Sequence, residues 1–151
     1  RVGPRRPLAA LALAALALAA VSSLASPWLA ERRLDGSLDA LAAGDTARAA
    51  RAAQRARALN PLSIRPLHRE AIAAEAAGRL DRAESLYVRA AELQPENPES
   101  WYELGRFRYE SRGDLDGAYV DLNRAYSLDN FHPRAGPLLD AIRKAFAARI
   151  R

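Results

Sequence analysis

The chain has 151 residues, a formal net charge of +5 at pH 7, 50% hydrophobic residues and no cysteine. This length is typical of a single domain. The lack of cysteine excludes a disulfide framework, a thiol nucleophile and a thiolate metal site. The first residue is an arginine rather than a methionine, which fits a processed or truncated piece of a longer protein.

An uncharged apolar run, Leu8–Ala25, lies near the start of the chain and follows a cluster of three arginines. Its 18 residues are about the minimum for a helix that spans a bilayer. Apolar residues occur all around the expected helix, whereas a surface helix should show a polar face. Pro27 ends the run, and Trp28 suits the headgroup level. We therefore predict a basic flank and a transmembrane helix over residues 1–27.

The charges around this run predict its orientation. Basic residues before it favour an N-terminus inside and the rest of the chain outside the cytoplasm, whereas Arg32 and Arg33 weaken this preference. We expect a membrane location, either as a single-pass anchor or as the last span of a longer protein. The alternatives are a signal peptide cleaved after Ala25 and a buried alanine-rich helix.

The rest of the chain repeats itself at a spacing of 34 and then 35 residues. A fixed period in this range indicates a stack of similar units, each of which buries its apolar face against its neighbours. The recurring positions are one glycine (Gly44, Gly78, Gly113), two alanines (Ala49, Ala83, Ala118 and Ala56, Ala90, Ala125) and one leucine (Leu59, Leu93, Leu128).

Each unit reads as two helices separated by its glycine, which suits the left-handed position that ends a helix. We expect helices over residues 28–43 and 46–59 in the first unit, and over 66–77 and 80–93 in the second. Asp45 is a good N-cap for the helix 46–59. Apolar residues recur at steps of three and four in the helix 80–93, which gives it one apolar face.

Gly136 and Pro137 begin a last helical stretch, Leu138–Ile150, with apolar residues on one side and basic residues on the other. A stack of repeats needs such a helix, because its end must be covered by a unit with a polar outer face. We predict a capping helix within residues 134–151. A basic amphipathic helix that lies on a membrane or enters a partner's groove is the alternative.

The last unit carries Trp101, Leu104 and Gly105 at the spacing W-x2-L-G. With the recurring alanines, this pattern resembles the tetratricopeptide repeat, a helix–turn–helix unit of 34 residues. Two features depart from it: one extra residue precedes Gly113, and Asn130 replaces the closing proline. The resemblance implies an all-α fold, an α-solenoid of about three units over residues 28–63, 64–97 and 98–133, of which the first is degenerate.

In this family the first helix of each unit lines a concave groove. The resemblance therefore implies a non-enzymatic, membrane-anchored scaffold that binds a protein or peptide partner through its concave face. The Lys, Asn and Arg set of the family's carboxylate-clamp subgroup is missing, so we do not expect recognition of an acidic peptide C-terminus. The groove residues implied by register are Arg65, His68, Ile72, Glu75, Glu99, Tyr102, Arg106 and Tyr109.

No motif for catalysis, a metal or a cofactor stands out in the sequence. His68 and His132 lie in different units, without further ligands at a spacing typical of zinc sites. There is neither a Gly-rich phosphate loop nor a G-x-S-x-G motif. We therefore expect no catalytic residue, no metal, no cofactor and no small-molecule substrate in this chain.

Arg48, Arg51 and Arg55 fall on one face of the expected helix 46–59. Such a face fits a patch for phosphate, lipid headgroups or nucleic acid, but also an ordinary solvated surface, which we prefer. After the apolar run, 20 basic residues stand against 18 acidic residues. This near balance argues against a nucleic-acid partner.

The stretch Gln94–Phe107, QPENPESWYELGRF, with an apolar run upstream, is also similar to repeat tails of bacterial O-antigen-ligase-like polysaccharide polymerases. This resemblance implies an alternative function in the cell envelope. The chain would be a regulatory or scaffolding tail of a polytopic membrane enzyme whose catalytic part lies upstream of Arg1.

Overall fold

The computed structural model describes residues 29–149, and this part of the chain is helical and contains no β-strand. The predicted all-α class is confirmed. The first helix seen covers residues 29–42. It is followed by α2 (Thr46–Leu59), α3 (Arg65–Ala76), α4 (Leu80–Leu93), α5 (Pro98–Phe107), the π-helical turn η1 (Arg108–Arg112), α6 (Leu115–Leu128) and α7 (Ala135–Arg149).

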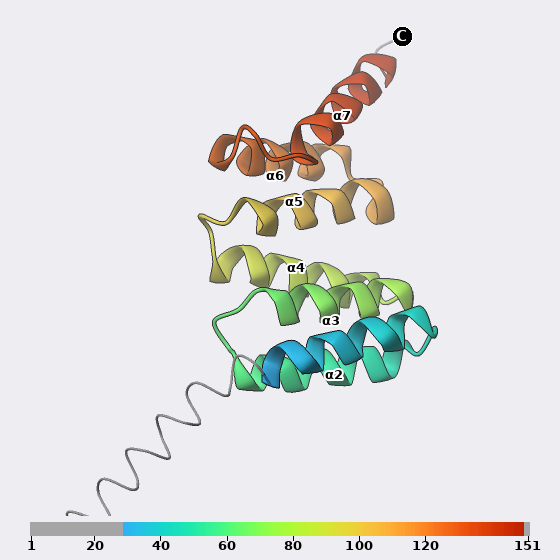
Figure 1. The fold of residues 1–151 in the computed structure, drawn as a ribbon. Helices are drawn as coiled ribbons and strands as arrows, with labels where there is room; N and C mark the ends of the chain where they lie inside the picture. The colour runs from blue at the N-terminus through green and yellow to red at the C-terminus, as the bar shows by residue number, and fades with distance from the viewer. Residues whose placement is uncertain (1–28, 150–151) are drawn as a thin grey trace, which may run out of the picture.

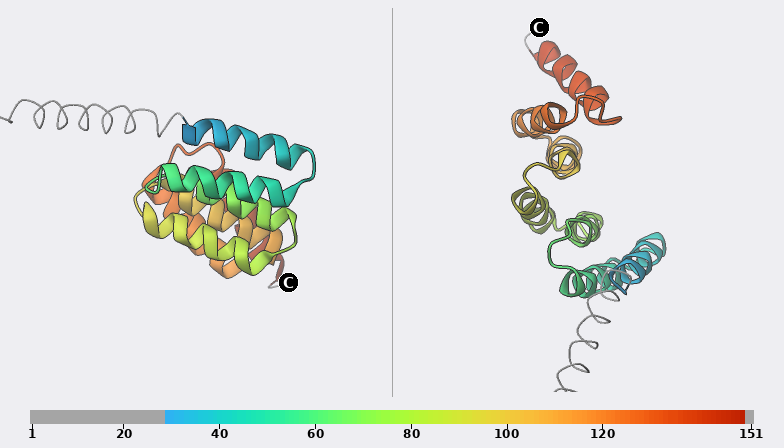
Figure 2. Two further views of the ribbon diagram at one scale, coloured as in Figure 1. Left: turned by 90° about the horizontal axis from the view of Figure 1, so that it is seen from below. Right: turned by 60° about the vertical axis from the view of Figure 1, so that its left-hand side comes forward.

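Successive helices stack in one direction and form an α-solenoid (Figure 1). Seen nearly end-on, they make two columns (Figure 2, right). One, which we term the A column, holds the 29–42 helix, α3, α5 and α7, and the other, the B column, holds α2, α4 and α6. Among α2 to α7, the most extensive packing joins α5 to α6, α2 to α3 and α3 to α4. The predicted stack of helix–turn–helix units is thereby confirmed.

A glycine ends the first helix of each unit. Gly44, Gly78 and Gly113 have φ angles of 75°, 70° and 66°, which residues with a Cβ adopt only with strain. After the first of these turns, the Asp45 carboxylate accepts a hydrogen bond from the amide of Arg48 at 2.8 Å. Asp45 is therefore the N-cap of α2, as predicted.

The interior changes in character along the stack. Around α3, α4 and α5 the core contains large side chains, and the rings of Tyr87 and Phe107 lie 5.2 Å apart between centroids. Both residues are 0% exposed. In the first unit the buried positions of α2 are alanines, which let the helix backbones approach closely: Ala49, Ala53 and Ala56.

The extra residue of the last unit is taken up inside a helix. α5 continues as η1, a π-helical turn over Arg108–Arg112, and Gly113 closes the unit. Arg108 holds this turn in place by donating to Asp121 of α6 at 2.8 Å and to Glu84 of α4 at 3.3 Å. Gly113 therefore ends its helix in the same left-handed conformation as the other turn glycines.

α7 covers the far end of the stack. Its buried residues Leu139 and Ile142 pack against apolar side chains of α6. The helix begins at Ala135, earlier than the predicted Leu138, because the Ala135 amide donates to Nδ1 of His132 at 3.1 Å and so has a capping partner. A packed terminal helix of this kind suits the capping role.

The predicted transmembrane helix and the whole segment 1–27 lie outside the described residues. Within residues 29–149, no helix is long and apolar enough to cross a bilayer. The membrane role of the apolar run stays a prediction.

Candidate functional site

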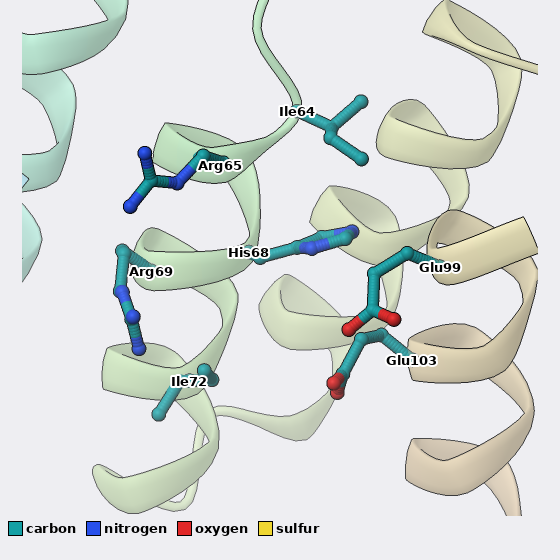
Figure 3. A pocket seen from close by; sticks show the side chains of 7 residues that line it. All are labelled: Ile64, Arg65, His68, Arg69, Ile72, Glu99 and Glu103. Atoms are coloured by element: carbon teal, nitrogen blue, oxygen red, sulfur yellow. The ribbon is translucent and has the colours of Figure 1, made fainter. Parts of the chain in front are cut away.

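A groove runs between α3 and α5 on the A column. It consists of two adjoining pockets of about 310 and 560 Å³, which share Arg69, Ile72 and Glu103. In Figure 3, side chains of α3 form one wall, and Glu99 and Glu103 of α5 form the other. We call both pockets together the α3–α5 groove, and its remaining lining residues are Ile64, Arg65, His68, Glu75, Ala76, Arg106 and Arg134.

Helical periodicity places the α3 side chains in this groove. The lining residues of α3, between Arg65 and Ala76, are spaced by three or four residues from one helical turn to the next. They therefore share one face of the helix. The opposite face of α3 is fixed in the core by Leu67, Ala71 and Ala74.

His68 lies deep in the groove, with its ring 6.0 Å from that of Tyr87 between centroids. Burial lowers the pKa of His68 to about 4; Arg69 acts in the same direction, and Glu99 opposes it. The imidazole is therefore neutral at pH 7. Its Nε2 atom is buried and has no hydrogen-bond partner within residues 29–149.

Arg106 joins the two walls of the groove. Its guanidinium donates to Glu103 and Glu110, both at 2.9 Å, and to Glu75 at 3.3 Å. It also donates to the Tyr87 hydroxyl at 3.0 Å. Three carboxylates thus neutralise this arginine within the protein, so its charge is not available to a ligand.

Glu75 is the central acceptor of this network. It accepts from the Ser111 hydroxyl at 2.5 Å and from the Tyr87 hydroxyl at 3.0 Å, besides Arg106. Burial opposes the charged form, but the hydrogen bonds from Ser111 and Arg106 outweigh it and lower the pKa of Glu75. The carboxylate is therefore charged at neutral pH and is held by the fold.

Equivalent positions of successive A-column helices carry alternating charges. Glu31, Arg65, Glu99 and Arg134 occupy this position in the order of the chain. Arg65 pairs with Glu31 at 2.5 Å, and Arg134 pairs with Glu99. The Arg134 guanidinium also lies 4.3 Å from the centre of the Tyr102 ring, and Tyr102 is only 6% exposed.

The predicted groove residues divide into two groups. Tyr102 and Tyr109 do not line the α3–α5 groove: Tyr102 lies beneath Arg134, and Tyr109 packs against the apolar cluster between α6 and α7. Contact of any of the eight residues with a partner stays a prediction. Those that do line the groove are Arg65, His68, Ile72, Glu75, Glu99 and Arg106.

The register argument missed five lining residues: Ile64, Arg69, Ala76, Glu103 and Arg134. Arg69 and Glu103 lie one helical turn after predicted residues, so the i, i+4 rule could have found them. Arg134 takes the place of Glu99 one repeat later, and extension of the register into the last helix would have included it.

Two groove groups have no partner in the described part of the chain. These are the Nε2 atom of His68 and the guanidinium of Arg69, which forms no ion pair there. Nor do residues 29–149 contain a group of three or more His, Cys, Asp or Glu side chains that could hold a metal ion. Since Nε2 of His68 is buried, the groove offers a ligand chiefly the positive charge of Arg69.

Residues 64–107 match the family model of the tetratricopeptide repeat. Similar solved structures include an O-GlcNAc transferase mutant from Thermobaculum terrenum, with a TM-score of 0.65 and 23% identity over 78% of this chain. The chain spans only 22% of that enzyme.

Two further structures contain peptides. The first TPR of Spaghetti (RPAP3), bound to an HSP90 peptide, has a TM-score of 0.70 and 19% identity over 80% of this chain and 98% of its own. The type III secretion chaperone SycD of Yersinia enterocolitica, in complex with a peptide of the translocator YopD, has a TM-score of 0.64 and 20% identity over 76% of this chain and 92% of its own. These likenesses show the fold. No protein of curated function matches the sequence.

Proposed function

We propose that this chain, a tetratricopeptide-repeat protein by its match over residues 64–107 and by its fold, is a scaffold that binds a protein or peptide partner in the α3–α5 groove. The observation that carries the proposal is the uneven use of charge in the groove. Its carboxylates are held by arginines, whereas His68 and Arg69 have polar groups without a partner in the described chain. Nε2 of His68 is buried, so the group that a ligand can reach is the guanidinium of Arg69.

The lining residues favour a peptide with one acidic and one apolar side chain. Arg69 provides a guanidinium for a carboxylate. Ile64 and Ile72 provide the apolar surface that the centre of an interface requires. No nucleophile or metal site accompanies these groups in the described groove, which suits binding without chemistry.

Peptide selection tests the groove directly. A phage-displayed peptide library is panned against the full chain in neutral detergent, and fluorescence anisotropy gives the affinity of each selected peptide. We expect Arg69→Glu to weaken binding about tenfold or more, because it places a repelling charge in the groove without breaking an ion pair.

Arg79→Glu is the matched control, since it makes the same charge change at an exposed position in the turn before α4. It should change the affinity by no more than a factor of about two. Equal weakening by both variants would indicate unspecific charge attraction and contradict the groove assignment. A library that yields no binder would also count against it.

The scaffold is further proposed to be anchored in a bacterial envelope membrane by residues 8–25, with the groove outside the cytoplasm. The uncharged length of the run and the arginines before it support this arrangement. Cells that carry a C-terminally tagged, full-length gene product are fractionated and treated with external protease. We expect a membrane-bound tag that the protease removes. A protected tag would reverse the orientation, and a soluble tag would refute the anchor.

A further inference from the structure

A second pocket, far from the groove, is lined by arginines. It lies between the 29–42 helix and α2 and measures about 210 Å³. No carboxylate is among its lining residues. We call it the arginine pocket, and it is formed by Arg32, Arg33, Gly36, Arg48, Arg51, Ala52 and Arg55.

The arginines of the pocket lie on a different face of α2 from the residues that contact α3. On α2, Gln54 and Arg57 point towards α3, where both reach Glu70. By helical periodicity Arg48, Arg51 and Arg55 lie along one face of α2, roughly 120° around the helix axis from the edge that carries Gln54 and Arg57. The 29–42 helix and α2 form one end of the solenoid (Figure 1), so the pocket belongs to the end unit of the stack.

Four arginines of this pocket differ from most of those elsewhere in the described chain. Arg33, Arg48, Arg51 and Arg55 form no ion pair with any residue between 29 and 149. Nine arginines elsewhere in that range do pair with a carboxylate: Arg57, Arg65, Arg82, Arg106, Arg108, Arg112, Arg124, Arg134 and Arg143. Like charges gathered around one cavity repel each other, and an anion in the cavity removes this repulsion.

Neither close packing nor backbone conformation requires a glycine at position 36, in the wall of the pocket. Gly36 lies inside a helix, where glycine is less favourable than alanine by about 1 kcal/mol. A Cβ built on Gly36 would meet no atom within 4 Å, so close packing does not demand a glycine there. Its φ angle is not in the left-handed region either. The missing side chain leaves space between the guanidinium groups, as does the small Ala52.

We propose that the arginine pocket binds a phosphate group, either of a lipid headgroup or of a soluble phosphate compound. Guanidinium groups hold phosphate oxygens through paired hydrogen bonds, which a cluster of arginines can supply from several directions. The lipid source has support from the sequence, because Arg32 and Arg33 closely follow the apolar run that ends at Ala25. Basic residues beside a membrane segment attract anionic lipids. This inference is independent of the α3–α5 groove.

Calorimetric titration of the full chain in neutral detergent tests the proposal. The probes are dihexanoyl phosphatidic acid, inorganic phosphate, and dihexanoyl phosphatidylcholine as the zwitterionic control. We expect phosphatidic acid to bind and phosphatidylcholine not to bind. Binding of inorganic phosphate with comparable affinity would assign a soluble phosphate compound as the source, and binding of phosphatidic acid alone would assign the headgroup.

Two variants locate the binding in the pocket. The triple change Arg48→Gln, Arg51→Gln, Arg55→Gln should weaken binding by about tenfold or more, since it removes three of the guanidinium groups. Gly36→Leu should weaken it as well, because the new side chain fills the space without altering the charge.

The matched control removes the same charge elsewhere, through Arg79→Gln, Arg89→Gln and Arg143→Gln. It should leave the affinity within a factor of about two. Three results would overturn the proposal: no binding of either phosphate probe to the wild-type chain, equal loss in both triple variants, or unchanged binding by Gly36→Leu.

Discussion

The arginines around α2 fall into two groups: those that pair with a carboxylate of α3, and those that line the arginine pocket. On the α3 side, Glu70 is 3% exposed and accepts from Arg82 at 2.8 Å and Gln54 at 3.0 Å. Nη1 of Arg57 lies 3.2 Å from it, at ion-pair distance but without hydrogen-bond geometry. On another face of α2, arginines line an open pocket. Neutralised arginines hold units together, whereas those without a carboxylate remain available to a ligand.

The apolar cores of the first unit and of the middle of the stack also differ. The middle of the stack is filled by aromatic and leucine side chains, with Tyr87 and Phe107 at 0% exposure. The first unit has an alanine-rich interior in which each side chain buries little apolar area. The first unit therefore depends more on its contact with α3, and Glu70 lies at the centre of that contact.

Loss of the Glu70 carboxylate should have the largest effect on stability. Glu70→Ala leaves Arg57 and Arg82 without their buried partner, which we expect to cost about 2–3 kcal/mol, less than for a fully buried pair because Arg82 is half exposed. Urea unfolding of the full chain, followed by circular dichroism, measures the change. Glu92→Ala, at an exposed position of α4, should have little effect. Similar losses in both variants would contradict a special role of Glu70.

Gly105→Ala and Gly36→Ala together compare how tightly the last unit and the first unit are packed. The added Cβ would lie 2.7 Å from Cγ of Leu122 and 3.2 Å from its backbone nitrogen, so the packed α6 must shift. We expect a loss of about 1–3 kcal/mol in the free energy of unfolding. Gly36→Ala, where no atom lies within 4 Å, should instead stabilise by about 0.5–1 kcal/mol. A loss at Gly36 would show that the first unit is as tightly packed as the last.

His68 should make the middle of the stack sensitive to acid. Its folded-state pKa of about 4 lies below the model value of 6.5, so the unfolded chain binds the proton more tightly. Stability is therefore full above pH 6.5 and falls as the pH drops towards 4, by on the order of 1–2 kcal/mol at pH 5.

The measurement compares urea unfolding of the wild type and His68→Gln at pH 7 and pH 5. The difference between the two chains isolates His68. Burial raises the pKa of Asp121 to about 6, against the effect of Arg108, and this group contributes in the opposite direction to both chains alike. An equal fall in both chains would refute the assignment to His68.

The smallest effect is expected in the arginine pocket. Arg48→Gln, Arg51→Gln and Arg55→Gln together should change the free energy of unfolding by less than about 0.5 kcal/mol, because no ion pair of the described chain is lost. The same urea series measures it. A loss as large as that of Glu70→Ala would mean that these arginines hold the first unit together, as Arg57 and Arg82 do through Glu70.

Features that follow from the repeat spacing or from the local sequence could be predicted from the sequence alone. The units, the turn glycines and the N-cap Asp45 depend on local spacing, and the structure reproduces them. The neighbours of a side chain could not be predicted in the same way. Tyr102 is covered because Arg134 arrives from the next unit, and Tyr109 belongs to the turn that takes up the extra residue.

The arginine pocket could not be predicted from the sequence either, because it needs residues of two helices. The spacing of Arg48, Arg51 and Arg55 indicated a shared face, yet a solvated surface was the preferred interpretation. The pocket forms only because the 29–42 helix brings Arg32 and Arg33 to the same cavity. Which arginines find a carboxylate is decided by tertiary packing, since most of the pairs lie on different helices.

The π-helical turn η1 has a consequence for how such a stack can change over generations. One added residue inside an α-helix would rotate everything after it by about 100°. In η1 the widened turn absorbs that residue before Gly113, so α6 and α7 keep their packing. Units of 34 and 35 residues can therefore stand side by side, and a lineage can gain or lose a residue there without redesigning its neighbours.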